Sequence, residues 1–228
     1  MKSTFEKLIA KKDTRGELEF VRELKKNHSH EMISFHYSLL NNRGDIRFYN
    51  SIRAGFEEHG EKGADFLIEQ LKTEKNESLM ADAIMILGLM RKSEVLTYCY
   101  EFQKHNNRDL RYKSIIVLGW VGDSNDLVLL EKTLYEESDT ELRGYAATAM
   151  GQIWFRKSDT KNEILRIFGD ALNNIKDREV KLYILSCCQD LMDLKLGIKE
   201  TRNGMKFSGK YEKIEKKAQL KIEETIKL

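Results

Sequence analysis

Proline is absent from this chain of 228 residues, and cysteine occurs only three times, at Cys99, Cys187 and Cys188. Without proline, turns and helix starts must be made by glycine, asparagine, aspartate and serine. The cysteines have no metal-ligand spacing, and the two that are adjacent on a predicted helix point their side chains in different directions. We therefore expect a reducing, cytoplasmic setting without a metal site.

Long apolar segments are also missing. No stretch approaches the roughly 20 residues that a membrane-spanning helix needs. The first residues, MKSTFEKLIAKKD, contain neither an uninterrupted apolar region nor a small-residue cleavage site, so we expect no secretory signal. With 41% apolar and 33% charged residues, the composition indicates a soluble protein with a long, thin core.

The net charge of +2 is small but unevenly distributed along the chain. Residues 1–44 carry nine basic and six acidic side chains, and residues 191–228 carry ten and six. Residues 45–190, between them, carry 20 basic and 25 acidic side chains. A continuous phosphate-binding track would need clustered bases on one face, so this distribution argues against nucleic acid as the partner.

What the chain does contain is a pattern that repeats five times. An acidic residue is followed by an apolar residue, usually a base, and then by an apolar run that closes on Leu-Gly or a similar pair. The copies are residues 45–55, 78–88, 109–119, 141–151 and 179–189. Their closing positions are 33, 31, 32 and 38 residues apart. A period of this size, carried by helical segments, is typical of an α-solenoid.

We predict one all-α domain over residues 1–228, a right-handed α-solenoid. Residues 1–44 form N-terminal capping helices, residues 45–191 hold five helix-pair repeats, and residues 192–228 form a loop and a C-terminal capping helix. The first helices of the pairs are expected near 64–71, 95–102, 127–134 and 164–172. In the last helix, Ile214, Ala218, Ile222 and Ile226 share one stripe that can cover the end of the core.

The second helices separate into two faces when each is numbered from its first apolar residue. Positions one, five, nine and twelve are apolar or small and should build the core between repeats. Position four lies on a different stripe and should face the groove. We therefore predict that a partner contacts Tyr49, Asp82, Lys113, Tyr145 and Tyr183, with Trp120 from position eleven. The apolar members of position seven could equally pack inside a repeat.

Two further features of the repeats invite a functional interpretation. The fourth interval is longer because WFRKSDTKNE is inserted, and Trp154, Phe155 and Arg156 form a second predicted partner site in that loop. A base recurs at position two, as Arg47, Arg111, Arg143 and Lys181. Binding of phosphate is one interpretation, but a ladder of ion pairs between repeats is favoured.

The pattern that ends in Leu118-Gly119-Trp120-Val121-Gly122-Asp123 resembles the HEAT-like repeats named after phycocyanobilin lyases. The resemblance covers about residues 45–191. It implies a curved right-handed stack with the second helices on the concave side, and it does not imply one activity.

Three enzyme classes with such repeats were compared with the residues. HEAT-like deoxyhypusine hydroxylases hold iron with several His-Glu pairs, and this chain has one, His30-Glu31. Alkylpurine DNA glycosylases use a basic concave face, whereas residues 45–190 are net acidic. A tetrapyrrole lyase would need a pigment-handling partner that no residue indicates. No catalytic residue, metal ligand or cofactor is assigned, because no catalytic grouping stands out from the general charge.

The sequence therefore predicts a non-catalytic scaffold that binds a protein partner in an aromatic concave groove. An inhibitor or immunity partner of a toxin is one form that such a protein takes, by analogy. Two alternatives stay open: a nucleic-acid-binding protein related to alkylpurine DNA glycosylases, and a tetrapyrrole-lyase-like enzyme.

Overall fold

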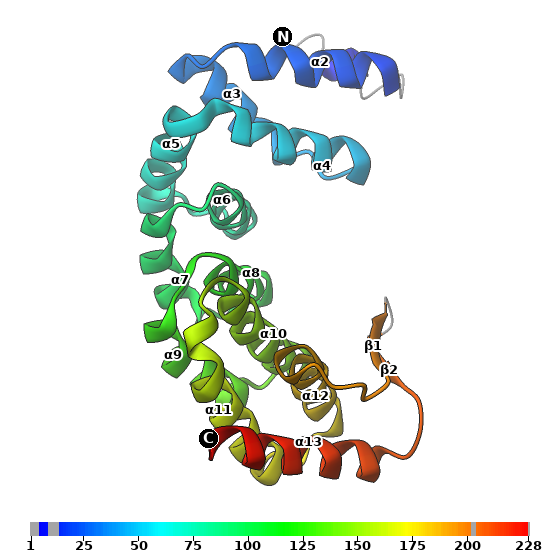
Figure 1. Cartoon of the computed structure of the whole chain (residues 1–228). Coiled ribbons are helices and arrows are strands. Elements are labelled where there is room, and N and C mark those ends of the chain that lie inside the picture. The colour runs from blue at the N-terminus through cyan, green and yellow to red at the C-terminus, as the bar shows by residue number, and fades with distance from the viewer. Residues whose placement is uncertain (1–4, 9–13, 202–203, 228) are drawn as a thin grey trace. The chain divides into compact units, whose positions relative to one another are not determined.

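The computed structural model describes residues 5–8, 14–201 and 204–227. Contacts between Cα atoms divide the chain into two compact units, Met1–Tyr98 and Cys99–Leu228. The boundary falls inside helix α7, Leu96–Phe102. Each unit is built mainly from helices (Figure 1).

The first unit consists of helices joined by short turns. Its elements are α2 (Thr14–Lys26), α3 (His30–Leu39), α4 (Ile46–Gly55), the 3-10 helix η1 (Phe56–His59), α5 (Gly60–Thr73), α6 (Glu77–Leu89) and η2 (Ser93–Val95). Helix α2 packs on α4, and α3 packs on α5. The core includes Leu24, Ile52, Phe56 and Leu67, all fully buried. Of the predicted N-terminal capping helices, residues 1–4 and 9–13 lie outside the described residues.

The second unit continues with helix pairs. Its elements are α8 (Arg108–Val121), η3 (Ser124–Asp126), α9 (Leu127–Glu136), α10 (Thr140–Arg156), η4 (Ser158–Thr160), α11 (Lys161–Asn174), α12 (Arg178–Met192), the strands β1 (Ile198–Thr201) and β2 (Gly204–Phe207), and α13 (Tyr211–Ile226). The second helices α8, α10 and α12 form one layer, because α10 packs against both α8 and α12. Helices α9 and α11 form the other layer (Figure 1).

Every second helix starts at an asparagine or aspartate whose side chain accepts hydrogen bonds from backbone N–H groups of the first turn. These N-caps are Asp45, Asn76, Asn107, Asp139 and Asp177, spaced 31, 31, 32 and 38 residues apart. Such caps satisfy amide groups that have no partner inside the helix. In a chain without proline, these side chains define where each repeat begins.

The N-caps correct the predicted register of the first repeat by two residues. Asp45 is itself the cap, whereas Asp109 lies two residues after its cap. Position one of the first repeat is therefore the buried Phe48, and Ile46, which the pattern placed there, is exposed. The sequence pattern misaligned this copy because Gly55 happens to occur near the place of the closing glycine.

With this alignment, the predicted core is confirmed at positions one, five and nine. All of these side chains are buried: Phe48, Leu79, Leu110, Leu142 and Val180; Ile52, Ala83, Ser114, Ala146 and Ile184; Phe56, Leu87, Leu118, Met150 and Cys188. Gly119 allows α8 and α10 to approach closely, since a Cβ atom there would lie 2.9 Å from the Cα of Ala149.

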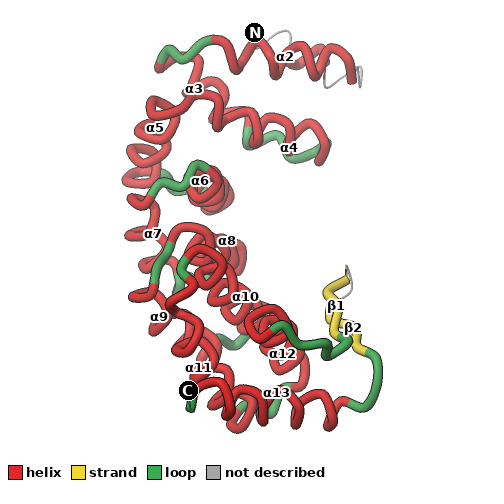
Figure 2. The backbone as a smooth tube through the Cα atoms, in the orientation of Figure 1, coloured by secondary structure: helices red, strands yellow, loops and turns green. Residues whose placement is uncertain are grey.

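The predicted C-terminal loop contains a β-hairpin that the sequence analysis missed. Strands β1 and β2 pair in antiparallel register, and Figure 2 shows them between α12 and α13. Gln189 attaches the hairpin to α12: its Oε1 accepts from the amides of Leu196 and Ile198, and its Nε2 donates to the carbonyl of Ile198. The residue that broke the glycine pattern therefore has a structural role in the last repeat.

The C-terminal helix packs at the end of the second unit. Helix α13 packs on α11 and α12. Ile214, Ala218 and Ile222 are buried, while Ile226, the fourth member of the stripe, is exposed. Within the described part of the chain, no helix is long and apolar enough to cross a membrane.

Candidate partner-binding site

Three tyrosines form a continuous row across the second helices of the second unit. Tyr112 of α8 lies 5.1 Å from Tyr145 of α10, and Tyr145 lies 5.8 Å from Tyr183 of α12, measured between ring centroids. Tyr145 and Tyr183 occupy position four, and Tyr112 precedes the position-four residue Lys113. The structure therefore brings together two of the predicted residues, Tyr145 and Tyr183, and adds Tyr112, which the sequence analysis did not select. We call Tyr112, Tyr145 and Tyr183 the tyrosine row.

The members of the tyrosine row differ in exposure. Tyr112 and Tyr145 are half-buried, whereas Tyr183 is buried. The hydroxyl of Tyr145 donates to Oε1 of Glu141 at 3.0 Å. Burial, together with the carboxylates of Glu141, Glu200 and Glu179, raises the pKa of Tyr183 to about 12. The pKa of Tyr145 is also raised, by burial and by Glu141, so both hydroxyls are neutral at physiological pH, and an acidic environment surrounds the α12 end of the row.

A glycine on α10 makes room for the buried tyrosine. A Cβ atom at Gly144 would lie between 2.3 and 2.6 Å from ring carbons of Tyr183. The ring therefore lies directly against the α10 backbone, and any larger residue at Gly144 would displace it. Tyr183 contributes the floor of the row rather than an accessible contact.

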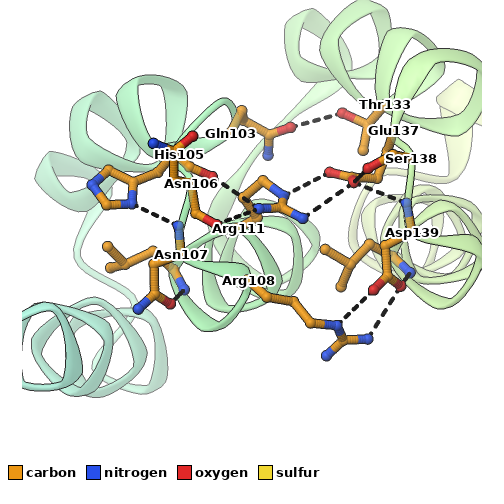
Figure 3. Close-up of polar contacts among 12 residues, drawn as sticks. Gln103, His105, Asn106, Asn107, Arg108, Arg111, Thr133, Glu137, Ser138 and Asp139 are labelled. Carbon is orange, nitrogen blue, oxygen red and sulfur yellow. Dashed lines mark hydrogen bonds and ion pairs between the residues drawn. The ribbon is translucent and has the colours of Figure 1, made fainter.

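Basic side chains at the α8 end of the row are already paired. Lys113 lies 3.8 Å from Asp109 and 5.2 Å from the centroid of the Tyr112 ring. Arg108 donates to Oδ2 and Oδ1 of Asp139 at 2.6 and 3.1 Å, as Figure 3 shows, and also to Glu141 at 2.5 Å. The contacts of Arg108 join α8 to the start of α10, and both basic side chains are paired with carboxylates.

Two residues predicted at the partner site, Tyr49 and Asp82, belong instead to a buried polar cluster of the first unit. Tyr49 is 5% exposed and Asp82 is 1% exposed. The Tyr49 hydroxyl donates to Oδ1 of Asp82, and Arg43 donates to Oδ2 of Asp82 at 2.5 Å and to the Tyr49 hydroxyl at 3.1 Å. These groups satisfy one another and join α4 to α6, and the buried Tyr49 and Asp82 present no face to a partner.

Trp154, Phe155 and Arg156 lie in the last turn of α10 and not in an inserted loop as predicted. The extra residues of this repeat lengthen both of its helices, since α10 has 17 residues against 14 in α8, and α11 has 14 against 10 in α9. Arg156 donates to the carbonyls of Gly119 and Gly122 at 2.8 Å each, where it caps the end of α8. Trp154 is half-buried against Phe155, with ring centroids 4.7 Å apart, and Phe155 is 70% exposed. Trp120 is also half-buried.

The predicted ladder of ion pairs is confirmed in the second unit. Arg111 pairs with Glu137 at 2.9 Å, Arg143 with Asp177 at 4.0 Å, and Lys181 with Glu215 at 2.5 Å. Each base reaches the following repeat or the cap. Arg47 differs, because it lies 3.6 Å from its own N-cap, Asp45.

Arg111 is the most fully bonded member of the ladder (Figure 3). Its Nε and Nη2 donate to the carboxylate of Glu137, and its Nη1 donates to the carbonyls of His105 and Asn106. A pocket of about 330 Å³ adjoins this cluster and also includes Gln103, whose Oε1 accepts from the Thr133 hydroxyl at 2.7 Å. Four of the five N–H donors of Arg111 are engaged in these bonds, and the charge is paired with Glu137, so its role is structural.

Three histidines that look scattered in the sequence form a hydrogen-bonded chain in the first unit. His28 Nδ1 lies 3.1 Å from His59 Nδ1, His59 Nε2 lies 2.8 Å from His36 Nδ1, and His36 Nε2 lies 2.9 Å from the carbonyl of Ile52. The carbonyl can only accept, so His36 Nε2 carries a proton. In the neutral state its Nδ1 then accepts from His59 Nε2, and His59 Nδ1 accepts from His28.

Two members of this chain, His36 and His59, are held neutral by their surroundings. Burial, with the neighbouring His59 and Lys25, lowers the pKa of His36 to about 4, and burial with His28 lowers the pKa of His59 to about 4. Among the residues that the structure describes, no group of three histidine, cysteine, aspartate or glutamate side chains is arranged to hold a metal ion. The spacing of these histidines in the sequence gave no signal, since their contacts depend on the packing of α3 against η1.

The stacked helix pairs define an all-α solenoid. Residues 64–151 match the family model of HEAT repeats, from within α5 to within α10. This central part of the chain is therefore HEAT-like, and the finer likeness to the phycocyanobilin-lyase type stays a prediction. No curated protein matches the chain.

Proposed function

We propose that this protein is a non-catalytic scaffold that binds a protein partner on the second-helix face of its second unit. The observation that carries the proposal is the tyrosine row, in which rings from three successive repeats contact one another. Tyrosine provides a large contact area at a small cost in side-chain entropy and is enriched where protein interfaces gain most of their energy. Solenoids commonly present such extended faces to partners.

The contacts of the basic side chains support a protein partner over a nucleic acid. Along the second helices of this unit, Arg108, Arg111, Arg143 and Lys181 all pair with carboxylates. Binding to nucleic acid depends on bases that can neutralise phosphates. On this face those charges are already compensated within the fold.

The proposal is tested by affinity capture from a nuclease-treated lysate of the native host, followed by mass spectrometry. Wild type is compared with Tyr145→Ala/Trp120→Ala, which removes two half-buried rings from the proposed face. The matched control is Val128→Ala/Tyr135→Ala, which truncates two exposed side chains of α9. All three proteins are first compared by circular dichroism and thermal unfolding.

We expect a protein that wild type and the α9 control retain and that the Tyr145→Ala/Trp120→Ala variant loses. Loss of two interface aromatics should weaken binding by about 2–4 kcal/mol, enough to remove a micromolar partner from the beads. Equal retention by all three folded proteins would refute the face as the binding site. Retention of no specific protein would count against the scaffold itself.

A further inference from the structure

We propose that the partner segment accepted by the tyrosine row is basic, a stretch of protein chain that presents arginine or lysine side chains to the rings. This inference rests on the proposed function and specifies the chemistry of the partner. It follows from the charges that surround the row, from the orientation of the β-hairpin beside it, and from the pairing of the bases nearby.

Carboxylates gather at the α12 end of the tyrosine row. Glu179 and Asp190 are exposed side chains of α12, and Glu200 is exposed on β1. Glu179 and Glu200, with Glu141, act electrostatically on the Tyr183 hydroxyl, and Asp190 and Glu200 act on the Cys187 thiol one turn further along α12. These carboxylates therefore lie close together, around the face of α12 that carries Tyr183 and Cys187.

The β-hairpin adds to this charge through its strand geometry. Alternate residues of a strand point to opposite faces, so Glu200 shares a face with the buried Ile198, and Lys199 lies on the other face. In the register of the hairpin, Lys206 is opposite Lys199. The hairpin packs on α12, so it turns its glutamate toward the tyrosine row and both lysines away from it.

Nearby bases do not neutralise these carboxylates. Arg108 and Lys113 pair with carboxylates at the α8 end, and Lys181 pairs with Glu215 of α13. Arg178 lies 4.4 Å from the centroid of Tyr211 and 5.0 Å from that of Phe207, over their rings. Among the described residues, no base is placed within ion-pair distance of Glu179, Asp190 or Glu200. Within the described part of the chain, these three carboxylates therefore have no ion-pair partner.

Aromatic faces beside free carboxylates favour a cation with an apolar stem. The ring face attracts arginine or lysine through its quadrupole, and a carboxylate at the edge pairs with the same group. An acidic peptide or a nucleic acid would instead be repelled by Glu179, Asp190 and Glu200. Charge complementarity therefore selects a basic protein segment as the occupant.

The test uses two synthetic probes, a peptide of six arginines and a peptide of six glutamates, titrated into the full chain and followed by calorimetry. The face variant is Glu179→Gln/Asp190→Asn/Glu200→Gln. Its matched control, Glu131→Gln/Glu163→Gln/Asp170→Asn, also removes three negative charges, but from α9 and α11. A third variant, Tyr145→Leu, removes one ring and keeps every carboxylate.

We expect the arginine peptide to bind wild type and the matched control with equal affinity within twofold. The face variant should bind it about tenfold more weakly, as expected for three lost charge contacts. Tyr145→Leu should bind it roughly two- to fivefold more weakly, because one cation–π contact is lost. The glutamate peptide should bind none of the four proteins.

Several outcomes would overturn the inference. They are equal losses in the face variant and its matched control, preference for the glutamate peptide, or no binding of the arginine peptide. The proposed function is judged separately by capture from the lysate with the face variant. A partner lost by Tyr145→Ala/Trp120→Ala but retained by the face variant would leave the scaffold standing and refute the basic segment.

Discussion

Acidification should destabilise the first unit through its chain of three histidines. His36 and His59 are buried and neutral, and each ring nitrogen on the path from His28 to the carbonyl of Ile52 is committed to one hydrogen bond. Protonation of His36 or His59 would place two N–H donors against each other and a charge in the core. The folded unit resists that protonation, whereas the unfolded chain does not.

The size and sign of the effect follow from the two pKa values. Burial lowers the pKa of His36 and of His59 from 6.5 to about 4. Above pH 6.5 both histidines are neutral in the folded and in the unfolded chain, so their full contribution to stability is present. Between pH 6.5 and 4 only the unfolded chain takes up the proton, and stability falls as the pH falls. For His36 the loss by pH 4 is about 3 kcal/mol, at about 1.4 kcal/mol for each pH unit.

Urea unfolding at pH 7, 6, 5 and 4, followed by circular dichroism, measures this loss. Titrating carboxylates also contribute in this range, so the comparison is between variants. His36→Gln keeps an N–H donor for the carbonyl of Ile52 and removes the ring that titrates. We expect it to be less stable than wild type at pH 7 and to lose about 3 kcal/mol less between pH 7 and pH 4.

The matched control is His105→Gln, which removes a histidine of the second unit and leaves the chain of three intact. Its stability should follow the wild-type dependence on pH. The ring protons of the histidines, observed by nuclear magnetic resonance, give an independent measurement. A His36 resonance that titrates at pH 6.5 or above, or a His36→Gln variant with the wild-type slope, would refute the reasoning.

Three other predictions test packing and hydrogen bonds in the second unit. Gly144→Ala should lower the free energy of unfolding by about 1–3 kcal/mol, because its Cβ would overlap the Tyr183 ring, as denaturant unfolding will show. Gly151→Ala, where the nearest atom outside the helix would be 3.6 Å away, should instead stabilise α10 by up to about 1 kcal/mol; equal effects would contradict the packing argument. Gln189→Ala should raise amide hydrogen exchange in the β-hairpin about thirtyfold, since three hydrogen bonds worth about 2 kcal/mol together are lost, and unchanged protection would show that other contacts hold the hairpin. Arg111→Met should lower the free energy of unfolding, measured by denaturant unfolding, by about 3 kcal/mol, because it leaves the Glu137 side chain, 7% exposed, without its charge partner. A change below about 1 kcal/mol would refute the structural role of Arg111.

The repeat unit itself was accessible from the sequence because its signals are local. Apolar residues at helical spacing must share a face, so the core positions of the second helices follow from counting along the chain. The ladder from Arg111, Arg143 and Lys181 also follows, since a base at the same place in each repeat meets similar surroundings. The pattern placed Lys113, Tyr145 and Tyr183 at equivalent positions, and the structure brings Tyr145 and Tyr183 into contact, with Tyr112 in place of Lys113 on α8.

Only the tertiary structure decided which of those side chains remain accessible. Tyr49 and Tyr183 both occupy position four in the predicted numbering, yet both are buried. Tyr49 is hydrogen-bonded to Arg43 and Asp82. Tyr183 packs directly against the α10 backbone at Gly144. The histidine chain and the hairpin held by Gln189 likewise depend on groups that are distant in sequence. Periodicity determines the direction in which a side chain leaves its helix, and the burial of that side chain is set by the neighbours that packing brings to it.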